Sequence, residues 1–282
     1  EFRRVLFRSY ECQNKDIIEY RKASYILGEL KDINAHCDLE DERVKVYCQP
    51  VLNTRTNRFA SAEALMRLEL PETGMVYPDQ FIPMAERHDY IHTLSKIILN
   101  KTCRQIKRLE QEGYQIDRVS VNFSILEFRR KEFCKDVMDI IRQNEIPYEK
   151  VAIELTESWN ETEFDNIKNT ITSLQKLGIK FYLDDFGTGY SNFERIIGLP
   201  IDVIKFDRSL TILAGKNAES RYMVGSFSDI FKNSHYEILF EGVENEKDED
   251  QCKQMNALYL QGYKYSKPIP IEELTRFLGR AV

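Results

Sequence analysis

Short runs rich in β-branched and aromatic residues recur from Val44 onward, and segments with helical periodicity separate most of them. Eight such runs stand out: VKVYCQPVL, RFASAEALMRL, VSVNFS, VAIELTE, KFYLDDF, DVIKFD, EILFEGVE and LYLQGYKYS. Between them, as in Asp79 to Glu110 and Phe164 to Leu177, apolar residues return every three or four positions, as in an amphipathic helix. Strands that alternate with helices predict parallel βαβ units, and eight in about 240 residues predict a closed barrel. A doubly wound open sheet is the structural alternative.

The first two runs should depart from this parallel rule. Only the turn-like segment NTRTN, residues 53–57, separates them. That is too short for a helical crossover, so the two strands should pair antiparallel. The expected fold class is therefore α/β, a TIM-like (β/α)8 barrel with an antiparallel first strand.

The chain ahead of the barrel divides into two parts. Residues 1–9, EFRRVLFRS, carry three arginines and one glutamate, and we expect a non-native remnant there rather than a basic juxtamembrane tail. Residues 10–42 are expected to be a lead-in, helical from Ile17 to Ala35, and residues 43–282 the domain itself, at the C-terminal end of a longer protein. No apolar run approaches the ~18 residues of a membrane-spanning helix.

The overall charge and the cysteines exclude some classes of site. A net charge of −6 argues against binding of duplex nucleic acid, which needs a basic face. It allows a small anion held through metal ions. The six cysteines include no Cys-x-x-Cys pair, which favours a reducing compartment over a zinc site or disulfide framework. His88 and His92 lack the glutamate of a His-Glu-x-x-His motif, so we interpret them as solvated histidines on a helix.

Polar side chains gather near the carboxyl ends of the predicted strands, where barrels of this type place their catalytic groups. They are Glu63, Asn122, Glu154, Glu157, Asp184, Asp185, Lys205, Asp207, Glu241, Glu244 and Gln261. Two like charges 4 Å apart repel by roughly 4 kcal/mol at an effective dielectric of 20. A cluster of acids accompanied by Lys205 alone therefore requires protons or cations. Oxygen ligands without histidine or cysteine select Mg²⁺ or Mn²⁺.

The adjacent acids Asp184 and Asp185 indicate two metal ions rather than one. Neighbouring residues on a strand face opposite ways, so both can reach one site only where the strand ends. The glycines of the following FGTG segment allow that turn. Such a pair can place one carboxylate between two metals about 3.5–4 Å apart and the other on the second metal alone. Paired metals of this kind are typical of phosphodiester and phosphomonoester hydrolysis.

Seven motifs occur in order, each at a strand end. They are EALMR (residues 63–67, preceded by YCQP at 47–50), VNFS (121–124), ELTES (154–158), DDFGTGYS (184–191), KFD (205–207), EGVE (241–244) and QGY (261–263). Together they resemble the EAL domain, the cyclic diguanylate phosphodiesterase of bacteria, from about Val44 to Leu278. Leu68 and Trp159 depart from the residues common in that family, and none of the family's metal ligands is missing.

The resemblance implies a role for each motif residue. Glu63, Asn122, Glu154 and Asp184 would hold a first metal ion, and Asp184 would bridge to a second one. The second ion would be completed by Asp185 and Glu241. Glu241, Glu63 and Lys205 would carry the catalysis. Lys205 would orient the attacking water and offset charge on the phosphate. Gln49, Arg67 and Gln261 would serve substrate binding, and Glu157 would anchor the loop after Asp185.

The implied reaction is hydrolysis of cyclic di-GMP to linear pGpG with two Mg²⁺ or Mn²⁺ ions. The resemblance further implies a homodimer and a cytoplasmic domain, with a sensory or GGDEF-type module or a membrane segment upstream. A non-catalytic cyclic di-GMP sensor or protein-docking EAL module is the alternative. An enolase-like barrel lyase is a third hypothesis, but it relies on a lysine or histidine base, whereas here one lysine lies among six acids and an amide.

Overall fold

The computed structural model describes residues 2–156, 164–188 and 193–279, and its strands form one sheet. The strands are β1 (Val44–Asn53), β2 (Arg58–Leu70), β3 (Gly74–Val76), β4 (Arg118–Asn122), β5 (Val151–Thr156), β6 (Lys180–Phe186), β7 (Val203–Phe206), β8 (Glu237–Phe240), β9 (Tyr259–Leu260) and β10 (Ile269–Pro270). The order is β10-β1-β9-β8-β7-β6-β5-β4-β2-β3, and pairing of β1 with β2 closes eight strands into a barrel. Strands β3 and β10 lie outside the ring.

The direction of the strands confirms the predicted fold. From β2 through β4, β5, β6, β7 and β8 to β9, every neighbouring pair is parallel. Strand β1 runs antiparallel to both of its barrel neighbours, β2 and β9. The short turn between Asn53 and Arg58 accounts for this, because it leaves no room for a crossover helix. An open doubly wound sheet is thereby excluded.

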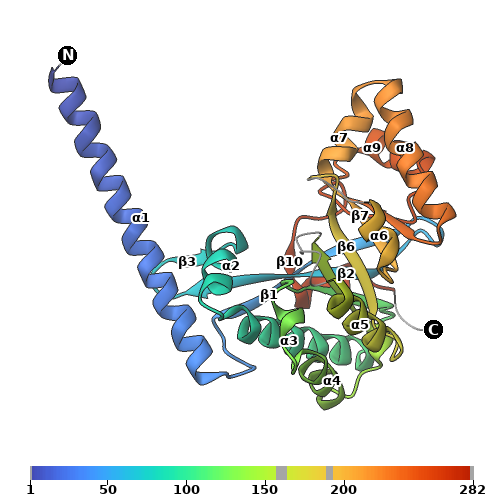
Figure 1. Cartoon of the computed structure of the whole chain (residues 1–282), viewed down its shortest axis with the longest axis horizontal. Helices are drawn as coiled ribbons and strands as arrows, with labels where there is room; N and C mark the ends of the chain where they lie inside the picture. Colours follow the sequence, from blue (N-terminus) through green and yellow to red (C-terminus); the bar gives the residue numbers. More distant parts are fainter. Residues whose placement is uncertain (1, 157–163, 189–192, 280–282) are drawn as a thin grey trace.

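Helices cover the outside of the barrel (Figure 1). They are α1 (Phe2–His36), α2 (Pro78–Arg87), α3 (Ile91–Gln111), α4 (Phe133–Gln143), α5 (Phe164–Gln175), α6 (Phe193–Gly198), α7 (Arg208–Lys216), α8 (Ala218–Asn233) and α9 (Glu246–Gln254), with 3-10 turns η1 (Glu127–Arg129), η2 (Tyr148–Lys150) and η4 (Ile271–Arg276). The helix predicted over residues 79–110 is in fact two, α2 and α3. They are separated by a turn in which Asp89 has a φ of 59°.

The predicted lead-in helix lies inside α1, which projects away from the barrel at its N-terminal end (Figure 1). Its C-terminal part is attached by the buried residues Ile26, Leu30 and Ile33, which lie on one helical face. The helical backbone begins at Phe2, so α1 also runs through residues 2–9, while the domain boundaries stay a prediction. Among the described residues, no helix is both long enough and apolar enough to span a bilayer.

The core consists of two apolar clusters separated by the barrel wall. A small cluster inside the barrel contains Val51, Ala152, Tyr182, Val203 and Leu239. A much larger cluster packs between the strands and the surrounding helices. Side chains of a strand alternate between these two sides. The next residue to face inward beyond the small cluster is therefore two positions further along each parallel strand, and two positions earlier on the antiparallel β1.

Candidate metal centre

A layer of polar side chains lies directly above the apolar cluster in the barrel. On the parallel strands each polar residue follows an inward apolar residue by two positions: Ala152 and Glu154, Tyr182 and Asp184, Val203 and Lys205, Leu239 and Glu241. On β1 the order is reversed, and Gln49 precedes Val51 by two positions. That reversal is what an antiparallel strand requires for its polar residue to reach the same layer. The sequence pattern and the barrel topology thus explain why these polar groups converge.

The ammonium group of Lys205 is the centre of this layer. Its Nζ lies 2.6 Å from Glu154 Oε2 and 2.8 Å from Asp184 Oδ1. It also lies 2.9 Å from Glu241 Oε1 and 3.4 Å from Glu63 Oε2. Lys205 and Glu154 are almost completely buried. One ammonium cannot neutralise four carboxylates, so the layer has an excess of negative charge. Because these groups are buried, that excess is unfavourable in free energy unless further cations or protons are bound.

The pKa values of the layer follow from this excess. Burial and the charge of Glu63 raise the pKa of Glu154 well above its ordinary value. Burial, with Asp184 adding to the shift and Lys205 opposing it, raises the pKa of Glu241 to about 8. Burial alone would lower the pKa of Lys205, but the surrounding carboxylates outweigh it and raise that pKa well above its ordinary range. The carboxylates around Lys205 therefore favour its charged form.

Amide side chains hold the carboxylate of Glu63 on both oxygens. Asn122 Nδ2 donates to Glu63 Oε1 at 2.8 Å, and Gln261 Nε2 donates to Glu63 Oε2 at 2.7 Å. Gln261 Nε2 also lies 3.0 Å from Gln49 Oε1, and Gln49 Nε2 donates to the carbonyl of Ser266 at 2.9 Å. Burial would raise the pKa of Glu63, but Lys205 and these amides outweigh it, so the pKa is lowered. Glu63 is thus held as an oriented carboxylate.

Asp185 joins the layer through a local distortion of β6. The pairing of β6 with β7 shifts between Leu183 and Phe186, and Asp185 has a φ of 57°. An aspartate tolerates this left-handed conformation better than most residues, and the irregularity turns its side chain toward Asp184. Burial and the charge of Asp184 raise the pKa of Asp185 to about 6.

Two groups of carboxylates can each surround a cation. Oxygen atoms of Glu63, Glu154 and Asp184 lie within 4.8 Å of one another, and so do those of Asp184, Asp185 and Glu241. Asp184 belongs to both groups, and it is the residue to which the family resemblance gives the bridging role. The oxygen-only donor set fits Mg²⁺ or Mn²⁺. Within the described residues, the buried Oε1 of Gln261 has no hydrogen-bond partner, a further free oxygen beside this layer.

Arg67 lies further along β2, about 13 Å from Glu63 at the usual rise of a strand. Its side chain is buried, and its guanidinium carbon lies 5.7 Å from the ring centre of Tyr47 and 5.4 Å from that of Tyr77. Its Nη1 also donates to the carbonyl of Met66 at 2.8 Å. Tyr47 belongs to the YCQP segment that precedes the EALMR motif, whereas Tyr77 belongs to no motif and precedes the proline that begins α2. The contact between Arg67 and Tyr77 joins β2 to the start of α2, two elements whose proximity the sequence pattern does not predict.

Two cavities adjoin the polar layer. One of about 230 Å³ is bordered by Gln49, Glu63, Glu241, Gln261 and Tyr263. The other, of about 560 Å³, lies between β2, β4 and α2 and reaches Asn122 and Ser124. Leu65 lines both cavities.

Three predictions about individual residues need comment. Glu157 and Trp159 fall outside the described residues. His88 is exposed as expected, but the expectation that His88 and His92 are solvated on one helix is otherwise wrong: His88 follows the end of α2, and His92 lies on α3 with a side chain only 13% exposed. His92 Nε2 lies 2.8 Å from Asp136 Oδ2.

Known proteins resemble this chain in sequence and in structure. The profile of the EAL domain matches residues 33–268. The chain is 31% identical over 235 residues to "Cyclic di-GMP phosphodiesterase PdeL" of Escherichia coli (strain K12), which covers 82% of this chain and 64% of that protein. It is 26% identical over 275 residues to "Signaling protein YkoW" of Bacillus subtilis (strain 168), 95% of this chain and 34% of that protein. The chain thus spans about a third of YkoW and less than two thirds of PdeL.

A solved structure agrees with the barrel. The "PaMucR Phosphodiesterase, c-di-GMP complex" has a TM-score of 0.78 to this chain at 26% identity, and the match covers 87% of this chain and 99% of that one.

Proposed function

The chain belongs to the EAL domain family, and on this premise we propose that it hydrolyses one phosphodiester bond of cyclic di-GMP to give linear pGpG. The names of PdeL and of the PaMucR complex support the choice of substrate. The observation that carries the proposal is the sharing of Asp184 between two groups of carboxylates at the mouth of the barrel.

The proposed first metal site consists of Glu63, Asn122, Glu154 and Asp184, and the second of Asp184, Asp185 and Glu241. When Mg²⁺ or Mn²⁺ ions are bound, they supply activation of water and neutralisation of charge on the phosphate. The amide of Asn122 donates through Nδ2 to Glu63, which leaves its carbonyl oxygen available as a ligand. The donor set, its burial and its excess of negative charge fit such ions.

The reaction adds water across one P–O3′ bond. The water oxygen joins phosphorus, the bond to the 3′ oxygen breaks, and that oxygen leaves with a proton, which gives the free 3′ hydroxyl of pGpG. Lys205 stays protonated beside the carboxylates, so in this proposal its role is to stabilise negative charge as it develops on the phosphate. Gln261 and Gln49 hold Glu63 in position.

We assign the second phosphate of the cyclic substrate to Arg67. A guanidinium offers a rigid fork of donors that suits phosphate oxygens, and the rings of Tyr47 and Tyr77 both pack near it. The two cavities lined by Leu65 offer space beside Asn122 and beside Glu63 and Glu241, which suits a ligand with two base moieties.

The test is to incubate the purified chain with cyclic di-GMP and Mn²⁺ and to follow pGpG by chromatography. The wild type should form pGpG with Mn²⁺ and none with EDTA. Glu63→Gln should lower turnover by about a hundredfold or more, because it removes a charged ligand while keeping the shape. Glu69→Gln, an exposed glutamate of the same strand whose carboxylate pairs with Lys45, is the matched control and should leave turnover unchanged.

The outcomes separate the proposal from its alternative. Binding of cyclic di-GMP by the metal-loaded wild type without any pGpG would establish a non-catalytic binding module. Turnover by Glu63→Gln at the wild-type rate would contradict the assigned site.

A further inference from the structure

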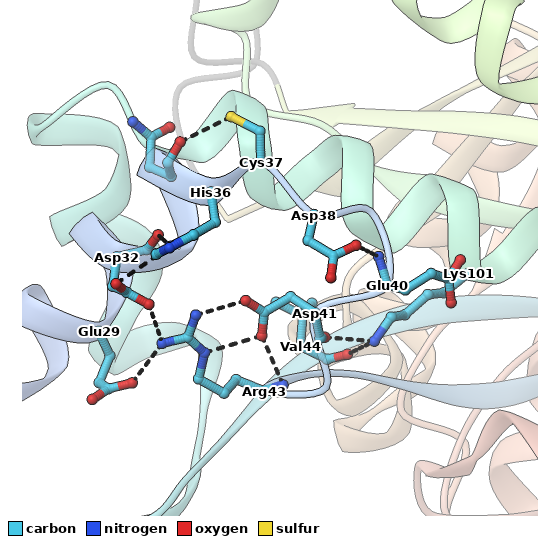
Figure 2. Close-up of polar contacts among 11 residues, drawn as sticks. Glu29, Asp32, His36, Cys37, Asp38, Glu40, Asp41, Arg43, Val44 and Lys101 are labelled. Carbon is cyan, nitrogen blue, oxygen red and sulfur yellow. Dashed lines mark hydrogen bonds and ion pairs between the residues drawn. The ribbon is translucent and has the colours of Figure 1, made fainter.

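The guanidinium of Arg43 connects helix α1 to the start of strand β1 (Figure 2). On the helix side, its Nη1 lies 2.8 Å from Glu29 Oε2 and 2.8 Å from Asp32 Oδ2. On the linker side, its Nε and Nη2 donate to the two carboxylate oxygens of Asp41 at 3.0 and 2.6 Å. One side chain thus holds two carboxylates of α1 and one of the segment between α1 and the barrel.

This arrangement is stronger than an ordinary surface ion pair. The Arg43 side chain is 23% exposed and that of Asp41 is 9% exposed. The hydrogen bonds that Arg43 donates to Asp41 raise the pKa of Arg43 despite its partial burial, and Arg43 in turn lowers the pKa of Asp41 against the effect of burial. A forked, multiply bonded arginine fixes geometry in a way that an isolated exposed pair does not. Removing these carboxylates should therefore change the position of the Arg43 side chain, in addition to removing an electrostatic attraction.

The backbone of Arg43 leads directly to Arg67. The carbonyl of Arg43 accepts the N–H of Glu69 at 2.8 Å. From there the β1–β2 pairing continues with Val44 opposite Leu68 and Lys45 opposite Arg67. Because consecutive pairs of an antiparallel ladder move together, the position of Arg43 sets the position of the strand segment that carries Arg67.

A second set of contacts joins α1 to the other side of Arg67. The Tyr77 ring that faces the Arg67 guanidinium belongs to the residue just before α2. Lys22 of α1 donates to the side chain of Gln80 on α2 at 2.7 Å. Helix α1 therefore contacts both elements that hold Arg67, the β1–β2 pair and α2. None of the contacts described for Arg43 involves the carboxylates around Lys205.

We propose that Arg43 is a positioning residue through which α1 sets the place of Arg67 and so the affinity for substrate. This inference rests on the proposed function, because it takes Arg67 as the residue that binds a phosphate of the substrate. A displacement of α1 would change the affinity for the phosphodiester and leave the metal centre intact. The position of helix α1 thereby influences the affinity for substrate.

The test compares two double variants of α1 that lose the same charge. Glu29→Gln/Asp32→Asn removes the helix side of the Arg43 contacts. Asp16→Asn/Glu19→Gln removes two exposed carboxylates of the same helix, away from Arg43, and is the control. For each we would measure hydrogen exchange of the Glu69 amide, KM and kcat for cyclic di-GMP, and affinity for Mn²⁺ by calorimetry.

In the first variant the Glu69 amide should exchange faster and KM should rise about tenfold, with kcat and Mn²⁺ affinity within about twofold of wild type. The control should match the wild type in all four measurements. Unchanged KM in the first variant, or an equal change in the control, would overturn the proposal. So would a joint loss of kcat and Mn²⁺ affinity, since that indicates general damage.

Two further results keep the two proposals separate. Arg43→Lys keeps the charge but loses the fork, so its KM should lie between those of the wild type and the first variant. If the wild type hydrolyses no cyclic di-GMP, the proposed function fails. The exchange rate of the Glu69 amide still shows in that case whether Arg43 links α1 to the strand.

Discussion

The Nζ of Lys205 lies 2.6 Å from Oε2 of Glu154, and both side chains are only 1% exposed. This pair comes from two strands, β7 and β5, that are separated in the sheet by β6. Asp184 of β6 contacts the same ammonium from between them. The lysine therefore occupies the centre of the carboxylates that we assign to metal ions, and its charge serves both the metal-free and the metal-bound protein.

Replacement of Lys205 by methionine separates these two roles. We expect turnover to fall about 10²- to 10³-fold, because a donor aimed at the developing charge is lost. Mn²⁺ should bind at least as tightly as before, because no ammonium competes for the carboxylates. The metal-free variant should lose about 3–5 kcal/mol of folding free energy, since its buried acids lack their cation. Steady-state kinetics, calorimetry and urea unfolding with EDTA or Mn²⁺ measure these three effects. Turnover within twofold of wild type would refute the catalytic role.

The acidic groups also predict how stability depends on pH. Glu241 has a raised pKa of about 8 and Asp185 one of about 6, both above the values of an unfolded chain. Above about pH 4 the folded protein therefore retains protons that the unfolded chain has released. The contribution of these two groups to stability is complete below about pH 4 and is lost as the pH rises through 6 and 8.

Mn²⁺ should reverse that loss, because it replaces the protons. The increase in Tm on adding Mn²⁺ should therefore be larger near pH 8.5 than near pH 6. Differential scanning calorimetry of the wild type and of Glu63→Gln measures both values. An increase that is equal at the two pH values would argue against metal binding by these carboxylates.

Gln261 should matter through Glu63 rather than through the substrate alone. Its Nε2 donates to Glu63 Oε2, whereas the side-chain hydrogen bonds of Gln49 in the described part of the chain go to Gln261 and to the carbonyl of Ser266. Gln261→Ala should weaken Mn²⁺ affinity about ten- to a hundredfold, because a residue that orients a metal ligand is lost. Gln49→Ala should weaken it less. The two affinities can be compared by calorimetry without nucleotide, and the opposite order would contradict the arrangement.

Gly262 is predicted to be irreplaceable for a packing reason. A Cβ at this position would lie 2.1 Å from the carbonyl oxygen of Val243 and 2.3 Å from its nitrogen, both of the main chain. Gly262→Ala should therefore cost about 1–3 kcal/mol or more in urea unfolding and displace the neighbouring Gln261. Gly28 in α1 is the matched control, because a Cβ there meets no atom within 4 Å. Gly28→Ala should instead stabilise by about 0.5–1 kcal/mol.

Much of the fold follows from local sequence pattern. The NTRTN turn is too short for a crossover and so makes β1 antiparallel, and the alternation of the later runs predicts the parallel strands. The polar layer is predictable for the same reason, since Lys205 interrupts an apolar strand at an inward position. Dimerisation and an upstream module stay predictions.

Other features depend on contacts between distant segments, which periodicity does not reveal. His92 has the spacing of an exposed helical residue, yet η1 and α4 bring Glu127 and Asp136 against it. The four contacts of Lys205 need the register of several strands at once. The rings around Arg67 need α2 to pack beside the extended part of β2.

The most direct test of the account is the anomalous diffraction of crystals soaked in Mn²⁺. It should show two peaks about 3.5–4 Å apart, with Asp184 between them and with Glu63 and Glu241 on opposite sides. A single peak, or peaks that Asp184 does not touch, would contradict a two-metal centre built on this residue.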